Sequence, residues 1–433
     1  MNRCTHLCLA LFLLVCLLTV SVAAFGQEVQ EQPPADPIPG RAFLDFFDDS
    51  LQTTAQIAAT NDPLLWGTLP TRLPRGTAMF QAIYRHRRID SYYQEDGDIE
   101  DKWLQVEYPD PYKEGERLFK MDAEFQGKIQ NLDLLFAYGL SENWMLYTIF
   151  PLQREETWLH VTFRPGTISA LGVRTADDFY RLMEKLGQPR PVTRWRSKAW
   201  QLGDMSGGVS WQYFHHRLAR LSLTGEAIFP TGRLADANRA LIYGLGPQID
   251  SGGGSFALAI NHRMEASMPG HEWLNLHLDG RYRYGFSGKR RVPRFLPPTA
   301  DTMQEWEQFG LDEAFFPGEF DDDFYTVTPG SQVEALGGVG FVFHYFAVGL
   351  GYRLSWKQEP ELEAERTMLD LLNATNAYQA EIAHGLSLEV GAPLYDVYVP
   401  GVLSLGYVHP TGGKNAFVAE DHFTLQLQML APF

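Results

Sequence analysis

The stretch FTLQLQMLAPF (residues 423–433) alternates between apolar and polar side chains. Because the side chains of a β-strand point to opposite faces with a period of two, this stretch predicts a strand with one apolar and one polar face. The apolar face carries Phe423, Leu425, Leu427, Met429, Ala431 and Phe433, and the polar face Thr424, Gln426 and Gln428. A strand of a soluble β-sandwich alternates in the same way, so the stretch alone leaves both architectures open.

The other end of the sequence predicts export. Arg3 is followed by an almost wholly apolar run over residues 7–22 and by the small residues Ala23 and Ala24, which is the pattern of a signal peptide. The run is short for a membrane span, which takes about 20 residues. We expect cleavage after Ala24. All three cysteines lie within this segment, so the exported chain is predicted to form no disulfide.

After the signal peptide the sequence has no second long apolar run. A chain crosses lipid only as helices or as a closed barrel, because every backbone polar group must find a partner. Alternating segments of about 9 to 13 residues follow one another from Ala78 onward. We therefore predict an all-β fold, a transmembrane antiparallel up-and-down β-barrel of about 14 strands (range about 12 to 16), with both termini in the periplasm.

Three segments carry the alternation most clearly, at 274–284, 119–129 and 346–357. Further strands are predicted at 78–88, 132–140, 144–152, 205–214, 221–229, 240–249, 256–262, 333–345, 378–384, 386–392 and 423–433, with 402–409 as an optional addition. The apolar face switches from odd to even numbers at Gln130 and Asn131, which indicates either a tight turn or a β-bulge in one long strand. We expect the charged faces to line the interior, with pore-lining residues Arg85, Arg87, Lys120, Asp122, Glu124, Lys128, His277, Asp279, Arg281, Arg283 and Arg353.

The remaining segments divide the chain into four parts. Residues 1–24 form the signal peptide, 25–40 a Pro-rich linker, 41–77 a periplasmic helix or plug, and 78–433 the barrel. Long loops are predicted at 90–117, 153–204, 287–331, 358–377 and 393–421. In the second of these, Thr175 and Asp178 have the spacing of a capping box, and Phe179, Leu182, Met183 and Leu186 form an apolar stripe that predicts a helix ending at Gly187. This helix is predicted either to fold into the mouth of the barrel and narrow it, or to lie on the rim of the barrel.

Composition excludes some functions. The sequence has 36 basic and 53 acidic residues and a net charge of −17, whereas a nucleic-acid partner requires a basic face. The acidic residues 321–323 lack the spacing of a calcium-binding loop, and adjacent histidines at 215 and 216 point apart on a strand. Asn261 and His262 faintly resemble the residues of barrel-wall phospholipases. We predict no metal, no cofactor and no catalytic residues.

Several short segments resemble the outer-membrane barrels of the MetA-pathway (phenol degradation) transporter group and related barrels of unknown function. They are AYGLSENWMLYTIFP (137–151), LGDMSGG (202–208), FPTGR (229–233) and the segment 62–74 before the first strand. The final strand likewise resembles the closing strand of bacterial outer-membrane barrels, whose terminal Phe is bound by the barrel-assembly machinery. Here Ala431 and Pro432 replace the aromatic and basic residues usual in those families.

These observations predict a passive outer-membrane channel or transporter for small solutes, with apolar or aromatic compounds favoured by the loop aromatics Phe315, Phe316, Phe320, Phe324 and Tyr325. The expected partners are outer-membrane lipid, the barrel-assembly machinery and a small-molecule solute. One alternative is a non-conducting structural or adhesion barrel with long surface loops. Another is a barrel-wall lipid hydrolase that depends on His262.

Overall fold

The computed structural model describes residues 73–432, apart from 111–112, 114, 186–189, 191, 217, 236–249, 292–323, 344–345, 365–378 and 395–400. The predicted signal peptide, the linker and most of the segment 41–77 therefore lie outside the described residues. So do the predicted strand 240–249, the acidic residues 321–323, Phe315, Phe316, Phe320, Leu186, Gly187 and Phe433. Among the helices that are described, none is long and apolar enough to cross a membrane.

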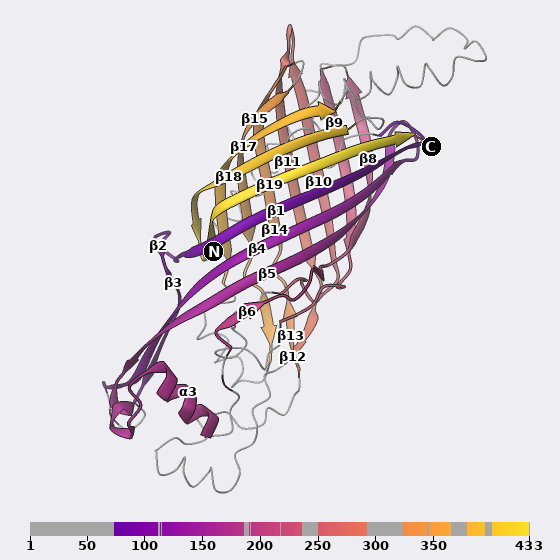
Figure 1. Ribbon diagram of the computed structural model, residues 1–433. Coiled ribbons are helices and arrows are strands. Elements are labelled where there is room, and N and C mark those ends of the chain that lie inside the picture. Colours follow the sequence, from indigo (N-terminus) through magenta and orange to yellow (C-terminus); the bar gives the residue numbers. More distant parts are fainter. Residues whose placement is uncertain are drawn as a thin grey trace, which may run out of the picture.

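Twelve strands close into an antiparallel barrel (Figure 1). Closure is direct, because β1 pairs both with β4 and with the last strand, β19. The predicted all-β transmembrane barrel is confirmed, and its strand number lies at the lower end of the predicted range. The barrel strands are β1 (Thr77–Tyr93), β4 (Arg117–Gly139), β5 (Trp144–Pro165), β8 (Ser206–His216), β9 (Ala219–Ile228), β10 (Ala257–Met268), β11 (His271–Gly285), β14 (Gln332–Val342), β15 (Ala347–Lys357), β17 (Glu381–Leu394), β18 (Gly401–Lys414) and β19 (Ala416–Pro432).

The two ends of the barrel differ in their connections. At the turn end, short turns join the strands, such as Pro269 and Gly270 between β10 and β11, where Gly270 has a φ of 77°. At the loop end, the connections are long, except that Asn415 alone joins β18 to β19. The short elements outside the twelve strands are β2 (Ile99–Glu100), β3 (Lys102–Pro109), β6 (Arg194–Arg196), β7 (Gln201–Leu202), β12 (Gly288–Arg291), β13 (Phe324–Thr328), β16 (Glu361–Glu363), the 3-10 helix η1 (Thr167–Leu171) and the helix α3 (Ala176–Lys185).

One predicted loop is a pair of strands. Residues 393–421, expected to be a loop, contain β18 and the start of β19, and the predicted strands 378–384 and 386–392 are joined as β17. Pro410 has no N–H to donate, yet it lies within β18. It pairs with Gly385 where the β17–β18 register shifts, and a proline is tolerated at such an irregularity.

The outer surface of the barrel carries an aliphatic belt between two groups of aromatic side chains. Leu350 and Leu405 are 56% and 57% exposed although they are apolar. Trp144 and Trp211 stack at the turn end with ring centroids 5.6 Å apart, and Tyr407 contacts Phe423 toward the loop end. Apolar side chains between aromatic girdles are the outer surface of a membrane-spanning barrel.

The closing strand β19 has the two faces that its sequence predicts. Phe423 and Leu425 are 44% and 45% exposed, whereas Gln426 and Gln428 are fully buried. Strand β19 lies beside β1, with Gln428 opposite Gln81 (Figure 1). The predicted outward and inward faces are therefore confirmed over this strand.

Strands β4 and β5 are about twice as long as a membrane strand needs to be, since a crossing takes about 9 to 11 residues. Their pairing runs without a register shift from Phe119 to Gly139, so Gln130 and Asn131 form neither a turn nor a bulge. At Gln130 and Asn131 the backbone is regular, but the environment of the two faces of β4 changes. Nearer the turn end, the even-numbered face, with exposed Phe136, meets lipid. Beyond Gln130 the odd-numbered face is apolar and buried, and beyond Gly127, where the pairing of β4 with β1 ends, the two strands leave the barrel as an arm.

The helix α3 packs on the apolar face of this arm. The ring of Phe179 lies 5.0 Å from that of Phe119 and 5.5 Å from that of Phe163, and Leu182 packs in the same cluster. The helix therefore lies on the arm, at one side of the barrel mouth (Figure 1).

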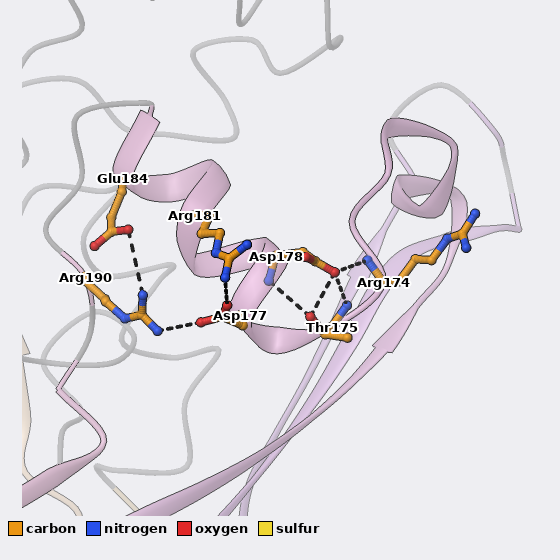
Figure 2. Close-up of polar contacts among 7 residues, drawn as sticks. All are labelled: Arg174, Thr175, Asp177, Asp178, Arg181, Glu184 and Arg190. Carbon is orange, nitrogen blue, oxygen red and sulfur yellow. Dashed lines mark hydrogen bonds and ion pairs between the residues drawn. The ribbon is translucent and has the colours of Figure 1, made fainter.

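The predicted capping box of α3 is present (Figure 2). The N–H of Asp178 donates to Thr175 Oγ1 at 3.2 Å, and the N–H of Thr175 donates to the Asp178 carboxylate at 3.0 Å. Hydrogen bonds from the Thr175 hydroxyl and the Arg174 N–H lower the pKa of Asp178. This contribution to helix stability is present at neutral pH and is lost as the pH falls through that lowered pKa.

Replacing Thr175 with alanine is expected to destabilise α3 by about 1 kcal/mol, because the first-turn N–H groups lose an acceptor. Amide hydrogen exchange of the helix measures this as a roughly fivefold loss of protection. Thr175→Ser keeps the hydroxyl and is the matched control. Equal protection in the alanine and serine variants would show that packing on the arm alone holds the helix.

Candidate functional site: the polar interior of the barrel

Charged and polar side chains gather on the inner face of the barrel. On β11, Leu276 is 48% exposed toward lipid, whereas its neighbours Asn275 and His277 are only 4% and 3% exposed. By the same alternation, seven of the predicted pore-lining residues lie on the inner face: Arg85, Arg87, His277, Asp279, Arg281, Arg283 and Arg353.

The wall formed by β9, β10, β11 and β14 holds a ladder of ion pairs. A guanidinium nitrogen of Arg281 lies 2.7 Å from a Glu226 carboxylate oxygen and 3.6 Å from one of Glu334. One register step away, Arg263 lies 2.9 Å from Asp279. Asn261 also donates to Asp279, at 2.7 Å. The charges of neighbouring strands on this wall thus neutralise one another in ion pairs.

A second group of charges lies on the wall formed by β4, β1 and β19, and Arg353 lies on β15, farther round the barrel. Arg85 of β1 forms an ion pair and hydrogen bond with Asp133 of β4. Arg87 faces inward two residues later and is paired in register with His422 of β19. Arg353 of β15 lies within electrostatic range of both Arg85 and His422. The interior therefore presents opposed charges on facing walls.

The sequence-based prediction missed several interior residues that complete these pairs. They are Asp133, Glu226, Arg263, Glu265, Glu334, Glu389 and His422. The period-two pattern contains them, because Arg263 and Glu265 alternate with apolar residues of β10. What the sequence lacks is the strand register, which determines which charges meet.

Four predicted pore-lining residues lie on the opposite face. Lys120, Asp122, Glu124 and Lys128 occupy the even-numbered face of β4, together with the lipid-exposed Phe136, and therefore point away from the interior. Lys120, Asp122 and Glu124 belong to the arm, where Lys120 lies 3.8 Å from Glu107 and the buried Asp122 lies 3.4 Å from Arg164. Lys128 lies opposite Arg88 of β1. The alternation predicted the strand correctly. The inner and outer faces were assigned wrongly, because the prediction took the apolar face to meet lipid along the whole strand.

The turn end of the inner wall is apolar on one side. Met79, Leu135, Met145 and Leu430 are buried against Leu73, which precedes β1. All four strand residues share the inward parity of the charged residues above them. The interior thus passes from a charged region toward the loop end to a partly apolar region near the turn end.

At the loop end, two of the segments named for their family resemblance are tied together. The Asp204 carboxylate accepts from the N–H of Gly232 at 2.9 Å and from that of Gly253. Thr231 accepts from the N–H of Met205 at 2.8 Å. A Cβ on Gly252 would lie 2.2 Å from Asp204 Oδ1, so only glycine fits this position. These segments therefore shape the mouth of the barrel.

The hydrolase alternative depends on a histidine that faces outward. His262 pairs with Gly280 and lies on the same face as the lipid-exposed Ile260. Its Nε2 lies 2.6 Å from the hydroxyl of Tyr213, which is also exposed. Within the described part of the chain, no group of three or more metal-ligating side chains comes together. His262 therefore lies on the outer face of the barrel and does not line the interior.

No family model and no curated protein matches the sequence. Among solved structures, the chain is similar to an outer membrane channel from Pseudomonas putida F1 (12% identity, 83% of this chain, 97% of that chain, TM-score 0.48). It is also similar to a Pseudomonas aeruginosa FadL homologue (10%, 87%, 94%, 0.31) and to the Ralstonia pickettii toluene transporter TbuX (6%, 83%, 90%, 0.33). At such low identity these likenesses assign no function to the chain.

Proposed function

We propose that this chain is an outer-membrane channel through which small solutes cross passively. The observation that supports it best is the polarity of the barrel, which is apolar outside and charged inside. Lipid requires the apolar exterior only. In a dry interior, charged side chains that are not fully compensated cost free energy. Arginines and carboxylates along the inner face are favourable where water and solutes pass.

The proposed route begins at the loop end, beside the segments tied by Asp204. A solute then meets Arg281 with its glutamates on one wall and the Arg85–Asp133 pair on another. Opposed charges across a narrow passage create a transverse field that orients dipolar solutes and sets ion preference. The buried glutamines of β1 and β19 and the apolar cluster follow toward the turn end. No energy source is required.

Conductance tests this function directly. Purified chain is inserted into planar bilayers, and its folding is checked first by the different gel mobility of boiled and unboiled samples. Discrete conductance steps are the expected result. Protein that is folded and inserted yet carries no current would contradict the channel and would favour a non-conducting barrel.

A matched pair of tryptophan variants locates the passage. Ser355 of β15 faces inward, whereas its neighbour Leu354 faces lipid. Ser355→Trp is expected to lower the single-channel conductance by roughly half or more, because it narrows the passage, and Leu354→Trp is expected to leave it unchanged. The same conductance in both variants would show that ions do not pass beside β15.

The outer-membrane location is part of the same proposal. It is supported by the lipid-facing belt and by the signal-peptide pattern of residues 1–24. We infer that the barrel-assembly machinery receives the chain through β19. Mass spectrometry of the protein from outer-membrane fractions tests the cleavage site, and the expected first residue is Phe25.

A further inference from the structure

Basic side chains gather on the outer face of the barrel toward the loop end, over β4, β5 and β6. Lys128 of β4 lies opposite Glu156 of β5, and Glu156 lies opposite Arg196 of β6. These residues share the outward face with the lipid-exposed Phe136. One row across the three strands therefore carries two cations around one carboxylate.

The row nearer the turn end adds two more cations. Arg154 of β5 faces outward, two residues before Glu156. Lys198 lies beside Arg154, because the chain continues past β6 in the same register: the Ser197 N–H donates to the Glu155 carbonyl at 2.9 Å. This row carries positive charge alone.

Glu156 compensates only part of this charge. Arg194 of β6 lies 3.0 Å from its carboxylate, and Lys128 and Arg196 act on it electrostatically. Among the described residues, the cations other than Arg194 form no ion pair. The five cations are here called the basic surface: Lys128, Arg154, Arg194, Arg196 and Lys198.

The edge of the basic surface along β1 is neutral by comparison. Arg88 of β1 lies opposite Lys128, but it pairs with Asp90 at 2.8 Å. It also lies opposite Asp421 in the β1–β19 register, where Glu420 follows at a register shift. The excess of positive charge therefore lies over β4, β5 and β6, where five cations accompany one glutamate.

The basic surface borders the lipid-facing belt. Leu202 of β7 lies opposite Leu152 of β5, and Trp200 and Leu202 are each 38% exposed. Every second residue of this edge, from the loop end toward the turn end, is Arg194, Arg196, Lys198, Trp200 and Leu202. Cations, then tryptophan, then leucine match the headgroups, the interface and the hydrocarbon of a bilayer.

Other described strands lack such a surface. The outward-facing residues of β10, β14, β15 and β17 include no lysine, arginine, aspartate or glutamate. Toward the loop end, β11 and β15 present Tyr284 and Trp356 instead. A membrane barrel thus has no general need for cations at this level, and one sector carries them.

We propose that the basic surface binds the phosphate groups of lipid headgroups in the leaflet at the loop end, so that phosphorylated glycolipid collects against β4, β5 and β6. Strand β1 begins and β19 ends at the turn end, which is the periplasmic end of a bacterial barrel, so the loop end meets the outer leaflet. The lipid A headgroup of that leaflet carries phosphates, to which arginine and lysine donate charge-assisted hydrogen bonds.

Charge complementarity favours this partner. The whole chain has a net charge of −17 and repels anionic lipid, so local cations decide where such a lipid binds. Lys128, Arg194, Arg196 and Lys198 are exposed and lie beside the hydrocarbon level, within reach of a headgroup. The inference requires the proposed outer-membrane location but does not require conduction.

Lipid retention by the purified, folded chain tests the surface. The barrel is isolated from mixed micelles that contain either lipid A or lipid A from which the phosphates have been removed, and the retained lipid is measured by mass spectrometry. Folding is checked by the gel mobility of boiled and unboiled samples. We expect lipid A to be retained at least about tenfold more tightly, since each cation near anionic lipid contributes about 1 kcal/mol.

A pair of double variants locates the site. Arg196→Gln/Lys198→Gln is expected to weaken lipid A retention roughly thirtyfold, which is about 1 kcal/mol for each cation. Lys113→Gln/Arg174→Gln removes two exposed charges from the arm and is expected to leave retention unchanged. Arg196→Lys keeps the charge and is expected to stay within about threefold of the unsubstituted barrel.

Equal retention of lipid A and its dephosphorylated form by the unsubstituted barrel would overturn the proposal, whatever the variants do. An equal loss in both double variants would also overturn it, because any cation on the chain would then suffice. The outcome is independent of the channel: a barrel that retains lipid A but carries no current keeps this surface and loses the proposed function. A barrel that conducts but does not distinguish the two lipids has the opposite result.

Discussion

Replacing Leu405 with arginine is expected to destabilise the folded barrel by about 2 to 4 kcal/mol. Leu405 is 57% exposed in the aliphatic belt and pairs with Leu425 of β19. An arginine there places a charge in hydrocarbon, where no water or counter-ion compensates it. Urea unfolding of the barrel in lipid vesicles measures the change.

The matched control is Gln126→Arg on β4. Gln126 lies on the same even-numbered face as the lipid-exposed Phe136, but on the arm, where it is exposed to water. Its substitution is expected to change the free energy of unfolding by less than about 0.5 kcal/mol. Similar losses in both variants would mean that the boundary between lipid and water is not at Gln130.

Replacing Arg263 with methionine is expected to cost about 3 to 5 kcal/mol of folding free energy, because Asp279 is left as a buried charge without its counter-ion. The two side chains are only 6% and 12% exposed and lie 2.9 Å apart, so water screens them little. Unfolding in the same vesicles gives the loss. A cost below about 1 kcal/mol would show that lumen water hydrates Asp279 after all.

The double variant Arg263→Met/Asp279→Asn tests the cause. Asparagine removes the charge but still accepts a hydrogen bond from Asn261. Most of the lost stability is therefore expected to return, and the coupling energy of the two substitutions measures the penalty for the unpaired carboxylate. If the double variant is as unstable as the single one, packing around the arginine stem is responsible.

The sequence predicts the membrane strands well where one face meets lipid along the whole strand, as in β11 and β19. It fails on β4, because the same strand crosses from lipid into water and its apolar face changes sides at Gln130 without any change in the backbone. The optional strand 402–409 is part of β18, but the predicted loop 393–421 is wrong, because β18 continues through Pro410, which is accommodated where the β17–β18 register shifts.

The interior site was predictable only in part. Period two places Arg281 and Arg353 on the inner face from sequence alone, but the sequence does not show that Glu226 and Glu334 both lie beside Arg281. Those facts follow from strand register and barrel closure, which join residues far apart in the chain. The pairing of charges in the interior is therefore a property of the fold.

The arm also provides a site for labelling the protein outside the barrel. From Arg117 to Gln126 it extends about 30 Å at the rise of a β-strand. All three cysteines lie within the first 16 residues, so after the proposed cleavage at Ala24 a cysteine in place of the solvent-exposed Arg181 would be the sole thiol. A fluorophore on this cysteine would lie outside both the bilayer and the passage. If intact cells are treated with a membrane-impermeant thiol-reactive fluorophore, labelling shows that the arm is on the outer side of the membrane. The label leaves the passage open.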